Sequence, residues 1–269
     1  MIFREIPDTK TSSREFQGPR EMAASNTHPV AFSMITKDKT ARILDMPCGA
    51  GAMAGRLIAA GFSDVTCADI DKSSFALDGV RFVKVDLRRS TPFPDGSLDV
   101  VICIECIEHL ENPFHLVREL ARILAQGGEV IISTPNVLST NARSKFLSAG
   151  YFPHFSDLAF RWDYNISLGF QAHIMPVPFC WLQYMAFLNG LELVELGTNR
   201  YARRPRLKDR LIGQIVKRVS RRFFPAEHYE VVTSDVVLYG DILVARFVKS
   251  RALESLKSGG ISGGHDVLF

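Results

Sequence analysis

Short apolar segments alternate with helical segments through the first half of the chain, and this alternation constrains the fold most. Five stretches are rich in β-branched residues and nearly continuous in apolar character, as strands buried on both faces are: "ARILDM", "DVTCADI", "RFVKVDL", "LDVVICI" and "GEVIIST". Between them, "AMAGRLIAAG" and "PFHLVRELARILAQGG" have helical spacing and a glycine just past the end. This order predicts an α/β fold with a parallel, doubly wound sheet.

The second half of the chain departs from this rhythm. An aromatic-rich insertion occupies about residues 140–178, and a basic segment of about 200–224 precedes a last strand, "YGDILVARFVK". At 269 residues the chain is long enough for one large α/β domain with insertions. We therefore expect a flexible N-terminal segment over 1–28, one domain over 29–250, and a flexible tail over 251–269.

The composition and the cysteines indicate a cytoplasmic protein. The first twenty residues contain no apolar stretch of signal-peptide length, and nowhere do eighteen apolar residues run together. The five cysteines give no disulfide framework, so we expect all of them to be reduced. Cys103 and Cys106 form a C-x-x-C across the end of a predicted buried strand, with no second pair, which argues against a zinc or redox site.

A glycine-containing loop follows the first predicted strand. In "ILDMPCGAGAMAGRL", residues 43–57, Gly49 and Gly51 stand between that strand and a helix. In an open parallel sheet the ligand lies beyond the carboxyl ends of the strands, where a glycine turn lets it approach the backbone. Asp69 ends the second strand, where a carboxylate can accept hydrogen bonds from two ribose hydroxyls. The loop predicts a nucleoside-like cofactor; the alternative is a tight turn with Asp69 as a helix cap.

The order of these features resembles that of the class I S-adenosylmethionine-dependent methyltransferases. "LDMPCGAG" matches the family's first motif, with Asp45 as its aspartate, and Asp69 matches the second acidic position. Asp86 in "KVDL" matches the acidic residue that faces the adenine, and "FPDGSLDVVICIECIEHLENP" and "ARILAQGGEVIISTPN" are similar to the family's fourth-strand and fifth-strand regions. The resemblance covers about residues 40–140. It departs from the family at Pro47, where glycine is more frequent.

The resemblance implies a Rossmann-like, seven-stranded, mostly parallel sheet with an antiparallel last strand. It also implies S-adenosylmethionine as the cofactor and in-line transfer of its methyl group, which needs positioning and a deprotonated acceptor. The cofactor-binding residues expected from it lie at the ends of the first four strands: Asp45, Gly49, Gly51, Asp69, Ile70, Asp86, Leu87 and Ile104.

The stretch "ECIEHL" follows the fourth strand and bears on the chemistry. If a helix begins there, Glu105, Glu108 and His109 share one face beside the methyl group, and we expect Glu105 and His109 to be catalytic. These side chains would also suit a divalent cation such as Mg²⁺. Similar stretches occur in ubiquinone-pathway O-methyltransferases and small-RNA 2′-O-methyltransferases, where the resemblance implies a metal completed by a later histidine, here His173. The alternatives are His109 as a general base without metal, and a helix start that only lines the site.

The basic segment concentrates positive charge beside apolar residues. From Arg200 to Arg222 the net charge is +9, so the rest of the chain carries −6 within a total of +3. Apolar residues recur there at helical spacing: Leu207, Leu211, Ile212, Ile215, Val216 and Val219. This pattern predicts an amphipathic helix that can lie in the interface of an anionic membrane. The alternatives are a helix packed on the sheet with a solvated basic face, and, less favoured without an aromatic platform, nucleic-acid binding.

Together these features predict a methyltransferase that acts on oxygen. "TPN", the aromatic insertion and the basic helix loosely resemble methyltransferases of cell-surface glycan and quinone pathways. We therefore expect a lipid-associated, glycan or quinone-like small-molecule acceptor, in the cytoplasm or peripherally at the inner membrane face. An RNA 2′-O-methyltransferase and a non-catalytic cofactor-binding scaffold or regulator are the other functions considered.

Overall fold

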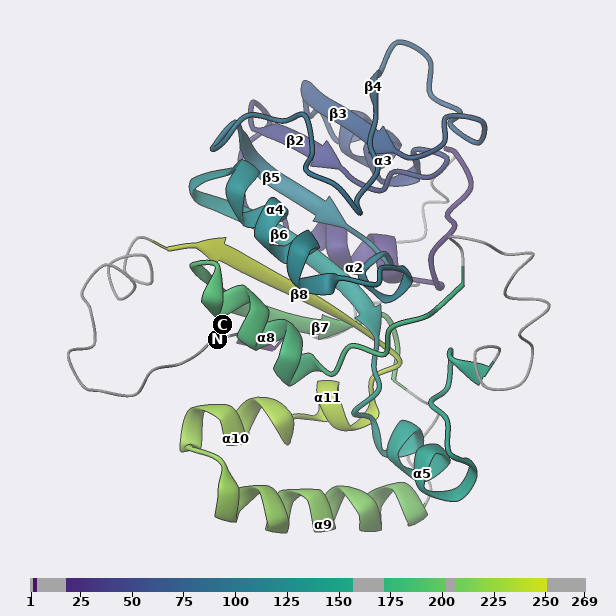
Figure 1. Cartoon of the computed structure of the whole chain (residues 1–269), viewed down its shortest axis with the longest axis vertical. Helices are drawn as coiled ribbons and strands as arrows, with labels where there is room; N and C mark the ends of the chain where they lie inside the picture. The colour runs from purple at the N-terminus through teal and green to yellow at the C-terminus, as the bar shows by residue number, and fades with distance from the viewer. Residues whose placement is uncertain (1, 4–17, 157–171, 202–206, 251–269) are drawn as a thin grey trace.

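The computed structural model describes residues 2–3, 18–156, 172–201 and 207–250. One sheet forms the centre of this part of the chain (Figure 1). Its strands are β1 (Ile2–Phe3), β2 (Arg42–Asp45), β3 (Asp64–Asp69), β4 (Arg81–Lys84), β5 (Leu98–Cys103), β6 (Leu124–Pro135), β7 (Leu191–Thr198) and β8 (Ile242–Lys249).

The strand order is β1-β7-β8-β6-β5-β2-β3-β4, and only β8 runs antiparallel to its neighbours. The predicted seven-stranded, mostly parallel sheet with an antiparallel last strand is therefore confirmed. The short strand β1 adds an eighth member at one edge, where Ile2 and Phe3 pair with Glu195 and Leu196 of β7. The sequence did not predict this strand because two residues show no periodicity.

The sheet is buried on both faces, which explains the continuous apolar runs of its strands. Neighbouring residues of one strand point to opposite faces, so Val100 and Val101 of β5 enter two different cores, and both are fully buried. Helices α2 (Thr27–Ser33) and α3 (Ala52–Ala59) pack on one face. The short 3₁₀ helix η1 (Ile107–His109), with α4 (Pro113–Ile123) and α8 (Phe179–Leu188), packs on the other.

The second predicted helix begins where expected but ends earlier, because it stops at Ile123 and residues 124–126 belong to β6. Helix α4 begins at Pro113, whose missing N–H costs nothing in the first turn, and the side chain of Asn112 accepts a hydrogen bond from the N–H of His115 at 3.0 Å. All five cysteines are free, as predicted, and only Cys180 is exposed.

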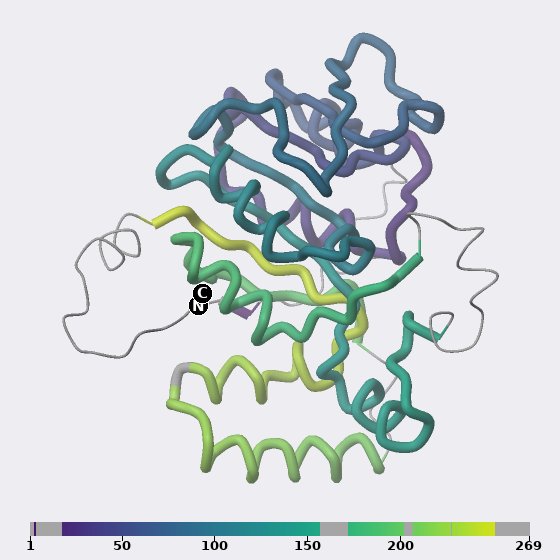
Figure 2. Tube along the Cα trace, in the orientation of Figure 1, coloured from purple at the N-terminus to yellow at the C-terminus, as the bar shows by residue number. Residues whose placement is uncertain are grey.

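Four further helices among the described residues lie at one end of the molecule (Figure 2), and their residues Val231, Val236 and Val237 belong to the core on the side of α4 and α8. They are α5 (Thr140–Ala149), α9 (Leu207–Phe223), α10 (Ala226–Val232) and α11 (Asp235–Tyr239), and they contact one another. Helix α9 confirms a helix over residues 207–223 of the basic segment, whereas Tyr201 forms a β-bridge with Gly240. Residues 202–206 of that segment, 157–171 of the aromatic insertion and the tail over 251–269 lie outside the described residues.

The N-terminal boundary of the domain lies earlier than the sequence suggested. Helix α2 begins at Thr27 and runs across the boundary expected at residue 29, and Thr27 is fully buried. Val30 and Ala31 of α2, with Met34 directly after it, fill the core against the sheet at helical spacing, a pattern that indicates a packed helix. Residues 21–28 pack with the domain, since Glu21 pairs with Arg56 and both Ala24 and Thr27 donate to Glu105, whereas 4–17 lie outside the described residues.

Candidate active site

The glycine loop connects β2 to α3 at the carboxyl edge of the sheet. Gly49 and Gly51 have φ angles of +50° and +91°, in the left-handed region that favours glycine. A Cβ atom at Gly51 would lie 2.9 Å from Cδ1 of Leu77 and 3.0 Å from Cε2 of Phe75. A side chain at Gly51 would therefore be both strained and obstructed, so this glycine is required by the fold of the loop.

Asp69 lies at the end of β3 and holds the glycine loop through its carboxylate. One oxygen accepts a hydrogen bond from the N–H of Gly49 at 2.8 Å, and the other from the N–H of Ile70 at 2.7 Å. The oxygen that accepts from Ile70 also accepts from the N–H of Asp71 at 3.4 Å, and the remaining lone pair of the carboxylate can accept from a ribose hydroxyl. The helix-cap alternative is wrong, since no helix follows β3 before β4 begins at Arg81.

The two other acidic residues of the predicted cofactor set already have partners. Asp45 is 2% exposed, and its carboxylate accepts from the N–H of Ala54 in α3 at 3.1 Å; burial raises its pKa to about 7. Arg88 donates to both carboxylate oxygens of Asp86, at 2.9 and 2.8 Å, and lowers its pKa to about 2. Asp45 thus fixes the helix behind the loop, whereas Asp86 lies half-buried at the edge.

Strand pairing brings the predicted cofactor residues to one edge of the sheet. Asp45 is in register with Cys67 and with Ile102, and Asp69 is in register with Lys84. The apolar members of the set differ in exposure: Ile104 is buried, whereas Ile70 and Leu87 are half-buried. A loop with two glycines beside a carboxylate fits a nucleoside-containing cofactor such as S-adenosylmethionine.

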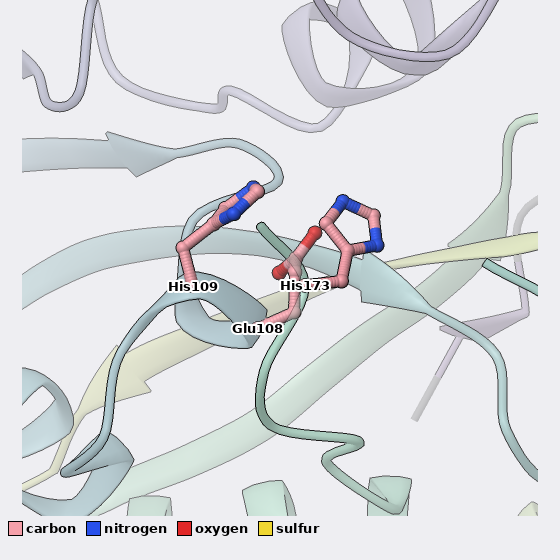
Figure 3. A group of neighbouring side chains, drawn as sticks. All are labelled: Glu108, His109 and His173. Atoms are coloured by element: carbon pink, nitrogen blue, oxygen red, sulfur yellow. The ribbon is translucent and has the colours of Figure 1, made fainter. Parts of the chain in front are cut away.

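A second group of side chains forms where η1 follows β5 (Figure 3). Glu108, His109 and His173 each offer a ligand atom, and these atoms lie within 4.8 Å of one another. The rings of His109 and His173 meet edge to face, with centroids 4.6 Å apart. We call these three residues the Glu-His-His cluster.

Backbone contacts hold the cluster together across a long sequence separation. The N–H groups of Ile174 and Met175 both donate to the carbonyl oxygen of Glu108 at 2.9 Å. The Nδ1 atom of His109 lies 2.9 Å from the carbonyl oxygen of Ala172. These contacts place His173 beside the stretch "ECIEHL", whereas its role as a metal ligand stays a prediction.

Glu108 is the most constrained member of the cluster electrostatically. Its side chain is fully buried, and neither carboxylate oxygen forms a hydrogen bond with a described residue. Burial raises the pKa of Glu108 to about 8. A buried carboxylate without hydrogen bonds is stabilised by a bound proton or by a cation, so this group fits a metal ion.

Glu105 lies apart from the cluster. The prediction that a helix begins at Glu105 is wrong. The 3₁₀ helix covers only residues 107–109, and Glu105 has a φ of +44°, so Glu105 and Glu108 do not share a helical face. The carboxylate of Glu105 instead accepts from the N–H of Ala24 at 2.8 Å and from Oγ1 of Thr27 at 3.1 Å. Glu105 therefore ties the N-terminal segment to the end of β5, and burial raises its pKa.

The structure adds polar residues that the sequence analysis missed. The imidazole of His154 is partly exposed and lies 3.0 Å from the Asp241 carboxylate. Arg200 donates to the same carboxylate at 2.8 Å. No local pattern could have joined these residues, because they come from three distant segments.

Comparison with known proteins identifies the domain. Residues 44–132 match the family described as a methyltransferase domain. A probable S-adenosylmethionine-dependent methyltransferase of Mycobacterium tuberculosis is 36% identical over 138 residues, which are 49% of this chain and 47% of that protein. The ubiquinone biosynthesis O-methyltransferase of Bordetella pertussis is 37% identical over 105 residues, 35% of this chain and 43% of that protein. The chain spans about half the length of the curated relatives it matches.

Among solved structures, the [4+2]-cyclase SpnF has the same fold, with a TM-score of 0.54 and 16% identity over 88% of this chain and 86% of that one. The fold and the matched region define a Rossmann-like methyltransferase domain. Residues 44–132 match the methyltransferase domain family, and the curated relatives similar to this part of the chain are named as S-adenosylmethionine-dependent methyltransferases. None of the described helices has the length and apolar character needed to cross a bilayer.

Proposed function

We propose that the protein transfers the methyl group of S-adenosylmethionine to an oxygen atom of a small acceptor. One observation carries this proposal: the cluster and the glycine loop lie at the ends of neighbouring strands. Glu108 and His109 follow β5, and β2, which pairs with β5, leads into the glycine loop. The similarity to an O-methyltransferase of ubiquinone biosynthesis supports oxygen as the acceptor atom. The acceptor class proposed is a hydroxyl of a lipid-associated, glycan or quinone-like molecule.

The side chains of the cluster have distinct tasks in this proposal. S-adenosylmethionine, when bound, supplies a methyl group on a positively charged sulfur. Because a carbonyl oxygen only accepts, the Nδ1–H of His109 donates to Ala172, which leaves the imidazole lone pair on Nε2. That tautomer suits an acceptor of the substrate's hydroxyl proton or a metal ligand.

The same residues could hold a divalent ion, as the resemblance implies. One carboxylate and two imidazoles would hold it: Glu108, His109 and His173. Imidazole donors suit Mn²⁺ or Zn²⁺, whereas Mg²⁺ prefers oxygen ligands, so we propose one of the former in place of Mg²⁺. Such an ion would lower the pKa of an acceptor hydroxyl.

Metal binding can be tested without knowing the acceptor. After treatment with a chelator, wild-type protein should bind Mn²⁺ or Zn²⁺ in calorimetry, and Glu108→Gln should weaken that binding by about 10-fold to 100-fold because the anionic ligand is lost. Glu111→Gln, an exposed carboxylate three residues further along the chain, is the matched control. Equal binding by both variants would contradict the metal site and leave His109 as the candidate base.

The reaction is tested with labelled S-adenosylmethionine and fractionated cell extract. We expect label in the lipid or small-molecule fraction with wild-type protein and, at limiting cofactor, about tenfold less or lower with Asp69→Ala. Label in RNA would replace this acceptor class with the RNA alternative. A protein that binds the cofactor but transfers no label to any fraction would favour the scaffold function, and the cyclase with the same fold shows that the fold alone does not fix the reaction.

A further inference from the structure

Helix α9 exposes a row of large apolar side chains. The row recurs at every fourth position, and each member is about half exposed or more: Leu207 at 75%, Leu211 at 58%, Ile215 at 62%, Val219 at 49% and Phe223 at 76%. We call these five residues the α9 stripe. Residues four apart lie on neighbouring turns of a helix, so the stripe is continuous along all of α9.

The opposite side of α9 is the side that packs against the protein. Gly213 and Ser220 are buried, and a Cβ atom at Gly213 would lie 2.7 Å from Oη of Tyr239 in α11. Small residues thus allow α9 to approach the neighbouring helices closely, while the stripe faces away. The alternative in which the apolar side of this helix packs on the sheet does not hold for the stripe, because its side chains are exposed.

Positive charge surrounds the stripe on the exposed side. Helix α9 contains six Lys or Arg residues and one acidic residue, Asp209, which is half-buried. At about 100° per residue, Arg218 and Arg222 project between the apolar positions, and both are exposed. The described outer face of α9 therefore combines apolar and cationic groups without an exposed carboxylate.

The apolar surface continues onto neighbouring segments. Phe224, directly after α9, is 42% exposed. Helix α5, which contacts α9, exposes Phe146 at 51% and Leu147 at 89%. The two helices that carry these exposed side chains, α5 and α9, lie at the same end of the molecule (Figure 1).

We propose that α9 lies in the interface of an anionic lipid bilayer, with the α9 stripe inserted and Arg218 and Arg222 at the head-group phosphates. Such a surface satisfies both kinds of side chain, because acyl chains bury the apolar groups and anionic head groups pair with the cations. Nucleic acid would use the cations but leave the aliphatic stripe in water. This inference goes beyond the methyltransferase activity and does not depend on it.

Co-sedimentation of the full chain with vesicles tests the proposal. Vesicles of roughly one part phosphatidylglycerol to three parts phosphatidylcholine should bind the protein at about 0.1 M salt. Binding should fall by about tenfold or more at about 1 M salt, or with phosphatidylcholine alone, because the Debye length shortens or the anionic lipid is missing. No binding to the anionic vesicles at low salt overturns the proposal.

Two double variants separate the apolar from the electrostatic contribution. Each double variant should weaken vesicle binding by about tenfold or more. The apolar variant is Leu211→Gln with Ile215→Gln, and the electrostatic variant is Arg218→Glu with Arg222→Glu. The matched control is Arg81→Glu with Arg118→Glu, which makes the same change in net charge at exposed positions on β4 and α4 and should bind as wild type does. Circular dichroism and thermal melting establish that each variant is folded, as expected at exposed sites.

Three results would contradict the membrane surface. Folded stripe variants that bind vesicles like wild type would overturn it, as would a control pair that loses binding as strongly as Arg218→Glu with Arg222→Glu. The third result is a dimer that forms with rising concentration in ultracentrifugation and is lost in the variant Leu211→Gln with Ile215→Gln. Together with an absence of vesicle binding, it would show that the stripe contacts a second copy of the chain. Transfer of label plays no part in these assays, so failure of the enzyme proposal leaves their outcome intact.

Discussion

Glu105 and Glu108 stand three residues apart after β5, yet their environments differ in kind. The carboxylate of Glu105 accepts two hydrogen bonds from the N-terminal segment, at 2.8 and 3.1 Å. That of Glu108 is fully buried, has no hydrogen bond with a described residue and lies beside two imidazoles. Two glutamates close in sequence thus have different roles. Glu105 fixes the structure around the site, and Glu108 is suited to bind a cation or a proton.

The same contrast holds between the two ends of the molecule. At the carboxyl edge of β2 to β5, Asp45, Asp69 and Asp86 are each held by defined hydrogen bonds. In α9, large apolar and cationic side chains are left exposed. The edge lies within the region that matches the family, residues 44–132, whereas α9 lies outside it. We infer that residues 44–132 bind the cofactor. The exposed surface of α9 serves contacts outside the catalytic domain, for which we propose an anionic membrane.

The largest expected effect separates cofactor binding from chemistry. His109→Ala should lower methyl transfer by about 10²-fold to 10⁴-fold, since it removes a base or a metal ligand, and should leave affinity for S-adenosylmethionine unchanged. His228→Ala, an exposed histidine on α10, is the control. Turnover with labelled cofactor and calorimetry measure the two quantities. Full turnover by His109→Ala would remove the cluster from the mechanism.

The pH dependence of stability tests the burial of Asp45. Its folded-state pKa is raised to about 7, so between about pH 4 and pH 7 the folded protein holds a proton that the unfolded chain has released. Stability should therefore fall as pH rises through this range. From about pH 5 to pH 8, wild type should lose about 2 to 3 kcal/mol relative to Asp45→Asn, which cannot titrate. Urea denaturation without cofactor measures this, and parallel pH profiles would contradict it.

A smaller effect is expected from breaking the contacts of Glu105. Glu105→Ala should destabilise the protein by about 1 to 2 kcal/mol and increase hydrogen exchange in residues 18–28, because two hydrogen bonds are lost. Mn²⁺ or Zn²⁺ binding should be unchanged. Glu111→Ala, with an exposed side chain, is the control. If Glu105→Ala loses metal and leaves exchange unchanged, the assignment of the two glutamates must be reversed.

Much of the sheet could be predicted because each of its main strands carries its own signal. The apolar signal is present on both faces of four strands: β2, β3, β5 and β6. The topology of parallel strands alone placed Asp69, the last residue of β3, beside the glycine loop. The antiparallel last strand came from the resemblance rather than from any pattern in "YGDILVARFVK".

The local geometry after β5 could not be predicted. A helical spacing assigned Glu105 and Glu108 to one face, but the hydrogen bonds from Ala24 and Thr27, some 80 residues earlier, hold Glu105 elsewhere. The exposure of the α9 stripe was equally hidden, because an amphipathic pattern shows which residues share a face and not what covers that face.

The central claim is that Asp69 and the glycine loop bind S-adenosylmethionine, and calorimetry on a matched pair of variants tests it most directly. Asp69→Ala removes the carboxylate at the loop, whereas Asp71→Ala removes an exposed carboxylate two residues further on that bonds to Ser73. With both variants folded, we predict that Asp69→Ala weakens binding by about 1.5 to 3 kcal/mol, roughly 10-fold to 150-fold, and that Asp71→Ala binds as wild type does. Unchanged affinity in a folded Asp69→Ala protein would contradict the account.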